Sequence, residues 1–328
     1  MQFGIRIPSY VWPDLTYERT RALRGYCRRV EELGFHGIWV IDHLLPSPAI
    51  YAVSWLEPLK VLAFVSGVTE HVAIGTGILI LPFRHPVLLA KEIASMVYLT
   101  GGRFILGVGG GWEPAEYRAM GVPFRERGAR TDEVLDSVKL LLTTRNASFK
   151  GRFFQFENVT IDPMPPECPP IWVAGGSLTH ADAPDKPYIA KSVLRRIMKA
   201  DAWIGRSSGS DKDSVMKDWE EVKAHARAAG RDPKSILYAH TQFVHIVDTH
   251  DREKALREQV PAFEAIMGRT RSLEDLMASY LIGSLDDICG RIEELRRSGL
   301  QYLMVNPMTD DPKQLDLIKQ HLMDRFPD

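Results

Sequence analysis

The sequence predicts an α/β fold in which eight parallel strands and their connecting helices close into a (β/α)8 TIM barrel with insertions at its rim. Two observations predict this fold. Short apolar runs of β type alternate with helical periodicity along most of the 328 residues, which is the pattern of parallel strands joined by helices. No linker divides the chain at its midpoint, so we expect residues 1–328 to form one domain without a separate dinucleotide-binding unit.

The expected strands follow one another along the whole chain, and each precedes a segment of helical character. They are Phe3–Ile7, Gly37–Ile41, Val72–Leu79, Arg103–Val108, Ile171–Ala174, Ala202–Gly205, Ile236–Val247 and Tyr302–Val305, and the last expected helix is Pro312–Arg325. Active sites of such barrels are built at the C-terminal ends of the strands. Candidate functional residues are therefore sought there.

Three segments interrupt this rhythm. Ser148–Val159 predicts a hairpin that turns at Lys150–Arg152, and a stiff proline-rich connector, Asp162–Pro170, follows it. Leu178–Tyr188 is polar and contains prolines, and we expect it to form part of a lid. Arg269–Ser284 is expected to be irregular.

Composition and charge exclude several classes of protein. With 41 basic and 42 acidic residues and no long basic block, the chain lacks the features of a nucleic-acid-binding protein. The longest apolar run, Val72–Phe83, is too short to span a bilayer, and no charged leader opens the sequence. Cys27, Cys168 and Cys289 are far apart and form no C-x-x-C pair, so we expect a reduced, cytoplasmic setting and no metal site.

The first candidate catalytic residue is His43, which follows Asp42 directly after the expected strand Gly37–Ile41. A side chain that leaves a strand at this rim reaches the pocket, and imidazole exchanges protons near neutral pH. A structural histidine that ties a loop is the alternative.

Glycines crowd the end of the fourth expected strand, in Gly107–Trp112. Such density lets the backbone approach a flat or phosphorylated ligand, although tight turn geometry alone would also explain it. The run is not a dinucleotide fingerprint, because Trp112 stands where the third glycine would be. We place Gly109, Gly110, Gly111 and Trp112 among the cofactor-binding residues.

Three further groups complete the candidate site. In Ala174–Ser177, two glycine amides and the Ser177 hydroxyl predict a phosphate cradle, although short Gly-Gly-Ser runs also occur in plain loops. Glycines inside the strand segment Gly75–Ile78 indicate close contact with a ligand. His240 and Gln242 share one face of the seventh expected strand and predict a substrate pocket.

No other catalytic signature competes with these candidates. The sequence contains no H-E-x-x-H, G-x-S-x-G or G-x-x-x-x-G-K-[ST] pattern, so it lacks the usual residues of a zinc protease, a serine hydrolase or a nucleotide hydrolase. The absence of a nucleophile motif favours an enzyme whose chemistry is carried by a bound cofactor.

Twelve short motifs follow one another along the chain in the order typical of one protein family. They are Phe3–Ile5, Glu32–Phe35, Trp39–His43, Ile74–Gly77, Arg84–Pro86, Gly101–Phe104, Gly111–Glu113, Glu116, Gly121–Phe124, Arg127–Gly128, Arg130–Glu133 and Pro170–Ser177. Taken together they resemble the luciferase-like flavin-dependent monooxygenases and their deazaflavin-dependent relatives.

The resemblance implies roles for individual residues. His43 would lie beside the isoalloxazine ring, with Asp42 among the residues that bind the cofactor. Gly77–Ile78 would be a non-proline cis peptide against the face of the ring. Gly175, Gly176 and Ser177 would hold the cofactor phosphate.

The resemblance also implies three possible functions. The first is a two-component monooxygenase that uses O2 and reduced FMN, supplied by a separate flavin reductase, to oxygenate a small organic substrate. The second is a hydride-transfer enzyme that uses coenzyme F-420. Trp112 favours FMN, because a carboxylate acid would occupy its position in deazaflavin enzymes of the sugar-phosphate type. The third is a non-catalytic flavin-binding or partner barrel subunit.

Family members commonly pair, and the apolar segments Val53–Val68 and Val87–Leu99 look too hydrophobic to face only solvent. We therefore expect a homodimer.

Overall fold

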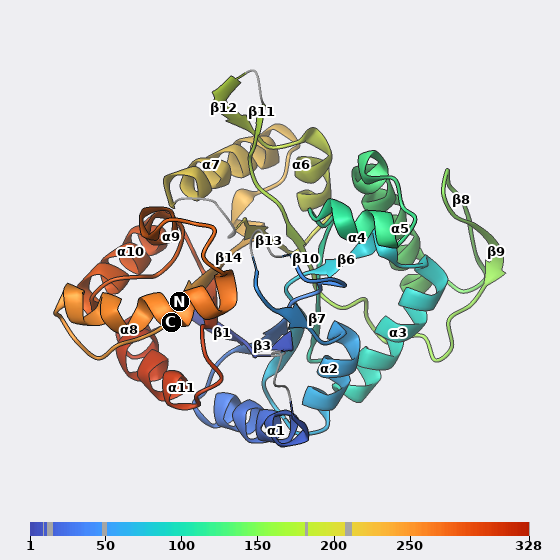
Figure 1. Cartoon of the computed structure of the whole chain (residues 1–328). Helices are drawn as coiled ribbons and strands as arrows, with labels where there is room; N and C mark the ends of the chain where they lie inside the picture. The colour runs from blue at the N-terminus through green and yellow to red at the C-terminus, as the bar shows by residue number, and fades with distance from the viewer. Residues whose placement is uncertain (9, 12–15, 48–50, 181–182, 207–211, 328) are drawn as a thin grey trace.

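The computed structural model describes the whole chain except residues 9, 12–15, 48–50, 181–182, 207–211 and 328. At its centre, eight parallel strands close on themselves, and helices surround them (Figure 1). Hydrogen bonds join the barrel strands in the order β1-β3-β5-β7-β10-β13-β14-β15, with β15 returning to β1. The predicted (β/α)8 barrel is confirmed.

The barrel strands are short and match the sequence prediction closely. They are β1 Gln2–Arg6, β3 Gly37–Val40, β5 Ala73–Thr76, β7 Phe104–Gly109, β10 Ile171–Ala174, β13 Ala202–Gly205, β14 Leu237–Val244 and β15 Tyr302–Pro307. The expected strand Val72–Leu79 ends early at Thr76, and a separate two-residue strand, β6 Leu79–Ile80, pairs with β7. The interruption falls on Gly77–Ile78, at the rim.

Helices follow most barrel strands and form the outer layer of the molecule. They are α1 Tyr17–Glu32, α2 Pro58–Ser66, α3 Pro86–Leu99, α4 Pro114–Ala119, α5 Arg127–Thr143, α6 Lys191–Ile197, α7 Lys212–Ala228, α8 Arg252–Met267, α9 Leu273–Ser279, α10 Leu285–Arg297 and α11 Lys313–Ile318. Short 3-10 turns lie at Leu81–Phe83, Phe124–Glu126 and Pro233–Ser235. The expected last helix, Pro312–Arg325, is α11 continued by a π-helical turn at Lys319–Met323.

Large aromatic side chains fill the interior of the barrel. Trp39 packs against Trp172 and Tyr302, and its indole nitrogen donates a hydrogen bond to the Tyr302 hydroxyl at 2.9 Å. A side chain at Gly75 would come within 2.4 Å of the Trp39 ring. The flat group that lies against Gly75 is therefore the protein's own indole rather than a ligand, which corrects that part of the prediction for Gly75–Ile78.

The rim insertions form small elements of their own. The predicted hairpin at Ser148–Val159 is confirmed as β8 Ala147–Lys150 and β9 Gln155–Val159. The Leu178–Tyr188 segment, expected only to be part of a lid, contains a second hairpin, β11 Leu178–His180 and β12 Ala183–Tyr188, whose residues 181–182 lie outside the description. It projects away from the barrel at the top of Figure 1. Two-residue strands β2 Tyr10–Val11 and β4 Ser54–Trp55 also pair.

Arg269–Ser284 is less irregular than expected. It contains α9, which begins because the Ser272 side chain accepts a hydrogen bond from the Asp275 backbone N–H. Its last residue, Ser284, starts α10 through a capping box with Asp287. The helix Leu285–Arg297, expected from the sequence to lead into the last strand, is confirmed as α10. The same cap signal, a serine followed three residues later by an acid, is present at Ser272, and the helix that begins there was not predicted.

The two ends of the chain meet beside the start of β1. The Met1 amino group donates hydrogen bonds to the backbone carbonyls of Phe326 and Pro327, at 3.4 and 2.8 Å. Figure 1 shows the two termini side by side. Within the described part of the chain, none of the helices has the length and apolar character needed to cross a bilayer.

Candidate active site

A cavity of about 640 Å³ opens among the C-terminal ends of the barrel strands. This is the rim where barrels of this type place their active sites. The cavity brings together most of the residues singled out from the sequence. The predicted residues that line it are Asp42, His43, Gly77, Ile78, Gly109, Gly110, Gly111, Trp112, Gly175 and Gly176.

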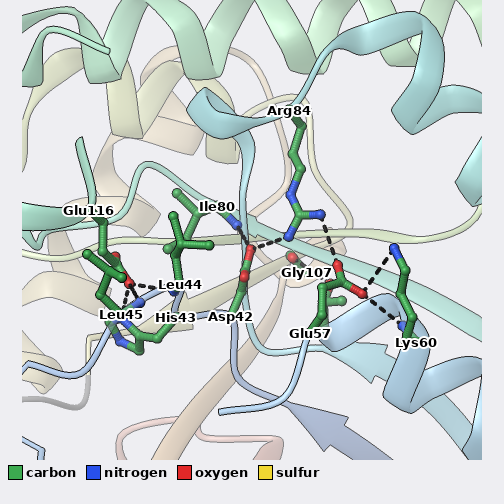
Figure 2. Close-up of polar contacts among 11 residues, drawn as sticks. Asp42, His43, Leu44, Leu45, Glu57, Lys60, Ile80, Arg84, Gly107 and Glu116 are labelled. Carbon is green, nitrogen blue, oxygen red and sulfur yellow. Dashed lines mark hydrogen bonds and ion pairs between the residues drawn. The ribbon is translucent and has the colours of Figure 1, made fainter. Parts of the chain in front are cut away.

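His43 lies at this cavity with only 8% of its surface exposed, held by a buried carboxylate. Its Nδ1 is 3.1 Å from Oε1 of Glu116 on α4, and the same oxygen accepts hydrogen bonds from the backbone N–H groups of Leu44 and Leu45, at 2.6 and 3.1 Å (Figure 2). A carboxylate only accepts, so Nδ1 of His43 is the donor in this contact. Nε2 is then the ring nitrogen left to exchange a proton with a bound molecule.

Aromatic rings fix the His43 imidazole from the other sides. The ring centroids of Trp55, Trp112 and Tyr51 lie 5.0, 5.4 and 5.8 Å from that of His43. The Tyr51 and Trp55 rings pack edge to face at 4.9 Å. We call Tyr51, Trp55 and Trp112 the aromatic cluster. Packing of this kind limits rotation of the imidazole, which a proton-transferring group requires.

Asp42 lines the cavity, yet its carboxylate serves a network within the protein. Oδ2 accepts hydrogen bonds from the Ile80 N–H at 2.9 Å and from Arg84 Nη2 at 3.0 Å, and Arg84 Nη1 continues to Glu57 at 3.0 Å (Figure 2). This network ties β3, β6 and α2 together behind His43. In the sequence Arg84 was only the first residue of the Arg84–Pro86 motif, and in the structure its side chain links these elements.

The peptide bond between Gly77 and Ile78 is cis, as the family resemblance implied. Both residues line the cavity, and the backbone carbonyl of Gly77 accepts a hydrogen bond from the Arg6 guanidinium. On the facing strand end, a side chain at Gly109 would meet Ile78 at 2.9 Å, and one at Gly111 would meet Ile80 at 2.9 Å. The glycines of β7 and its loop thus let two strand ends close together into a wall of the cavity.

The Gly175–Ser177 turn uses two of its three amides inside the protein. The Gly175 N–H donates to the Ile204 carbonyl at 3.3 Å, and the Ser177 N–H donates to Oδ2 of Asp218 at 2.8 Å. Gly175 and Gly176 line the cavity, and Ser177 is not among the lining residues. The Asp218 carboxylate thus holds an amide that the sequence assigned to a phosphate.

His240 and Gln242 do not line the cavity, so their assignment to the substrate pocket is wrong. Both are buried in β14, with at most 1% of their surface exposed. Gln242 Nε2 lies 2.8 Å from His240 Nε2, and His240 Nδ1 lies 3.2 Å from the Gly205 carbonyl oxygen. Alternation along the strand predicted their common face correctly, but that face is packed, and Thr241 reaches the cavity in their place.

The charged lining of the cavity was not predicted from the sequence. Five arginines line the cavity against one carboxylate, that of Asp42, among the described residues; they are Arg6, Arg125, Arg127, Arg196 and Arg206. A cavity with this balance attracts anions. Arg127 and Glu116 stood in the motifs of the family resemblance without a role, and only their positions in space reveal one.

Comparisons with known proteins agree with this architecture. A model of the luciferase-like monooxygenase family matches residues 1–302. The chain is 31% identical over 245 residues to an F420-dependent glucose-6-phosphate dehydrogenase of Amycolatopsis mediterranei, a match that covers 72% of this chain and 68% of that protein. It is 34% identical over 177 residues to an uncharacterised protein of Mycobacterium tuberculosis, but this match spans only 56% of that relative's length.

Solved structures resemble the whole chain in fold. An F420-dependent secondary alcohol dehydrogenase in complex with an F420–acetone adduct superposes with a TM-score of 0.78 at 18% identity, covering 100% of this chain and 99% of that one. The oxygenating constituent of 3,6-diketocamphane monooxygenase from Pseudomonas putida, in complex with FMN, gives a TM-score of 0.73 at 18% identity and the same coverage. At these identities the likeness concerns the fold alone.

Proposed function

The chain belongs to the luciferase-like monooxygenase family, and we propose that within it the chain is an F420-dependent oxidoreductase that transfers hydride to or from a small alcohol or carbonyl compound. One observation supports this most directly: a proton acceptor, His43 held by Glu116, lies at a cavity lined by five arginines. The similarity to F420-dependent glucose-6-phosphate dehydrogenases, 31% and 33% identical over 72% and 66% of this chain, favours F420 over FMN.

The residues present fit such a cofactor. A flat ring needs walls without bulky side chains, and Gly77, Gly109 and Gly110 supply them. The deazaflavin carries a phosphodiester and a carboxylate-bearing tail, and the arginine-rich lining matches these negative charges. Arg127 and Arg196 are the candidates to bind the tail. Both line the cavity, and the backbone of Gly128, next to Arg127, lies close to the Arg196 and Ser192 side chains.

When bound, the cofactor supplies a carbon that accepts or donates a hydride. The chain's own part is to manage the proton. In alcohol oxidation, the C–H electron pair leaves the carbinol carbon as hydride while His43 Nε2 takes the hydroxyl proton, so that a carbonyl forms. Glu116 holds Nδ1 and stabilises the positive charge that the imidazole gains. The aromatic cluster restricts water around the ring.

The experiment is a cofactor titration of the purified chain. Fluorescence quenching should show micromolar or tighter binding of F420, and the protein should then reduce F420 with some alcohols, followed by loss of the cofactor's visible absorbance. Binding of reduced FMN with no binding of F420 would instead support the second candidate, a two-component FMN monooxygenase, which Trp112 at the cavity favours. Binding of either cofactor without any turnover would favour a non-catalytic barrel.

A further inference from the structure

Arg6 is a partly buried cation that no carboxylate in the described part of the chain neutralises. It is the last residue of β1, its side chain lines the cavity, and Nη2 donates to the Gly77 carbonyl. Its Nε is buried and has no hydrogen-bond partner among the described residues. The side chain as a whole is partly exposed.

The other arginines of the lining differ from Arg6 where their contacts are described. Arg196 forms an ion pair with Asp132, and Arg206 donates to the Ser177 carbonyl at 2.9 Å. Arg127 donates to the Phe124 carbonyl and lies over its ring. Among these four arginines, Arg6 is the one whose side chain has a buried nitrogen without a hydrogen-bond partner in the described part of the chain.

An enclosed guanidinium without a counter-charge is unfavourable, because desolvation is not offset by an ion pair. Burial lowers the pKa of Arg6 to about 10, with only the nearby Tyr51 opposing the shift. Arginine nevertheless stays protonated at neutral pH. A void of about 10 Å³ beside Arg6 has room for at most one water, which could satisfy Nε without cancelling the charge.

The position of Arg6 favours the substrate as the source of the missing anion. Tyr51, the group that acts on its charge, belongs to the aromatic cluster around His43. The arginines assigned to the cofactor tail, Arg127 and Arg196, lie instead with Gly128 and Ser192. Arg6 therefore faces the part of the cavity where the reacting group meets His43.

We propose that Arg6 binds a carboxylate or an equivalent oxyanion of the substrate, so that the enzyme acts on small hydroxy or oxo compounds that carry a negative charge. This inference rests on the proposed hydride-transfer function for the reaction itself, but the anion site can be tested without it. Charge-assisted hydrogen bonds to a carboxylate are stronger than those to a neutral group, and Arg6 would thus select charged over neutral substrates of the same shape.

The test compares benzoate with benzamide, which share a shape and differ in charge. Isothermal titration calorimetry on the full chain, with and without F420, should show benzoate binding at least about tenfold more tightly. Arg6→Gln should abolish this preference and Arg6→Lys should keep part of it. Arg29→Gln, which removes an exposed arginine of α1, should leave it unchanged. No preference in the wild type, or an unchanged preference in Arg6→Gln, would overturn the proposal.

Two further readouts separate the alternatives. Arg6→Gln should raise the melting temperature of the ligand-free chain, because it removes an unbalanced buried charge, whereas a merely structural arginine would lower it when replaced. If Arg6→Gln weakens F420 binding and leaves the benzoate preference intact, Arg6 serves the cofactor and the proposal fails. If F420 does not bind but Arg6-dependent benzoate binding remains, the proposed function fails and the anion site stands.

Discussion

At the scale of single residues, the two buried histidines His43 and His240 differ in their hydrogen-bond partners. Glu116 is fully buried, and its Oε1 oxygen receives two backbone N–H groups as well as contacting His43. His240, by contrast, is enclosed with neutral partners, Gln242 and the Gly205 carbonyl. His43 thus contacts a carboxylate at the cavity, whereas His240 contacts only neutral groups in the barrel interior.

His43→Asn should abolish proton transfer while it leaves the pocket intact, because asparagine can still donate to Glu116. We expect turnover to fall by about 10²- to 10⁴-fold, the usual contribution of a general base, with little change in cofactor affinity. Glu116→Gln should reduce turnover less, since the amide oxygen can still accept from Leu44 and Leu45. Steady-state kinetics and cofactor titration measure both effects. Full activity in His43→Asn would mean that another group moves the proton.

Gly176→Val tests whether the Gly175–Ser177 turn contacts the cofactor phosphate. The new side chain would meet Asp218 at 2.7 Å and Arg206 at 2.9 Å, and it would narrow the cavity at this wall. Loss of one or two contacts to the phosphate should weaken the binding of a phosphorylated cofactor about tenfold or more, and it should change the affinity for riboflavin little. Gly25→Val on α1, where a side chain meets nothing within 4 Å, is the matched control. Equal weakening of FMN and riboflavin would exclude the turn as the phosphate site.

His240 should make the protein sensitive to acid. Burial lowers the pKa of His240 from 6.5 to about 4, so the unfolded chain takes up this proton at a higher pH than the folded one. The stability that the neutral histidine contributes is complete above pH 6.5 and is lost as the pH falls towards 4, in total about 3 kcal/mol. His240→Asn should therefore lose less stability than the wild type across this window in pH-dependent thermal unfolding. His71→Asn, at an exposed histidine, should follow the wild-type profile.

The sequence predicted that His43 and the glycines would lie at the cavity because strand ends are recognisable locally. It could not predict that the Asp218 carboxylate would accept the Ser177 N–H, or that Arg6 would have no carboxylate partner among the described residues, because these facts depend on segments far apart in the chain. The error at His240 and Gln242 has the same origin. Alternation tells which residues share a face, but only the closed barrel decides how deep in the interior each one lies.

At the scale of elements, close packing between neighbouring strands determines where glycine is required. β5 and β7 approach so closely that a side chain at Gly107 would come within 1.9 Å of the Thr76 backbone oxygen. The Thr76 hydroxyl also donates to the Gly107 carbonyl at 2.7 Å. The sequence predicted that Gly107 serves ligand approach or a tight turn. The structure shows that it is also needed for the two strands to pack closely.

Gly107→Ala should destabilise the barrel by about 2–3 kcal/mol or more, because a backbone atom of the next strand has to move. Gly290→Ala on α10 is the control, since its side chain meets nothing within 4 Å and alanine favours helix. Thermal unfolding should show a lower midpoint for the first variant and an equal or higher one for the second. An unchanged melting temperature for Gly107→Ala would show that β5 and β7 can move apart without loss of stability.

At the scale of the whole molecule, the outer helices differ in how much apolar surface they leave uncovered. The expected interface included both Val53–Val68 and Val87–Leu99. On α2, Leu59, Leu62 and Val65 are buried in the core, so their hydrophobicity needs no partner chain. On α3, Leu88 and Leu99 remain about three-fifths exposed, at 59% and 63%. Of the two expected segments, α3 is therefore the one with large exposed apolar residues that a partner chain would cover.

We therefore propose a homodimer that covers the exposed face of α3. Sedimentation at micromolar concentration should show a species of twice the 37.0 kDa chain mass. Leu88→Glu should shift it towards the monomer, because a carboxylate buried at an apolar interface lacks a partner. Leu273→Glu, at an exposed leucine of α9, is the matched control and should leave the mass unchanged. A wild-type chain that sediments only as a monomer would show that exposed leucines on α3 are tolerated singly, as they are on many protein surfaces.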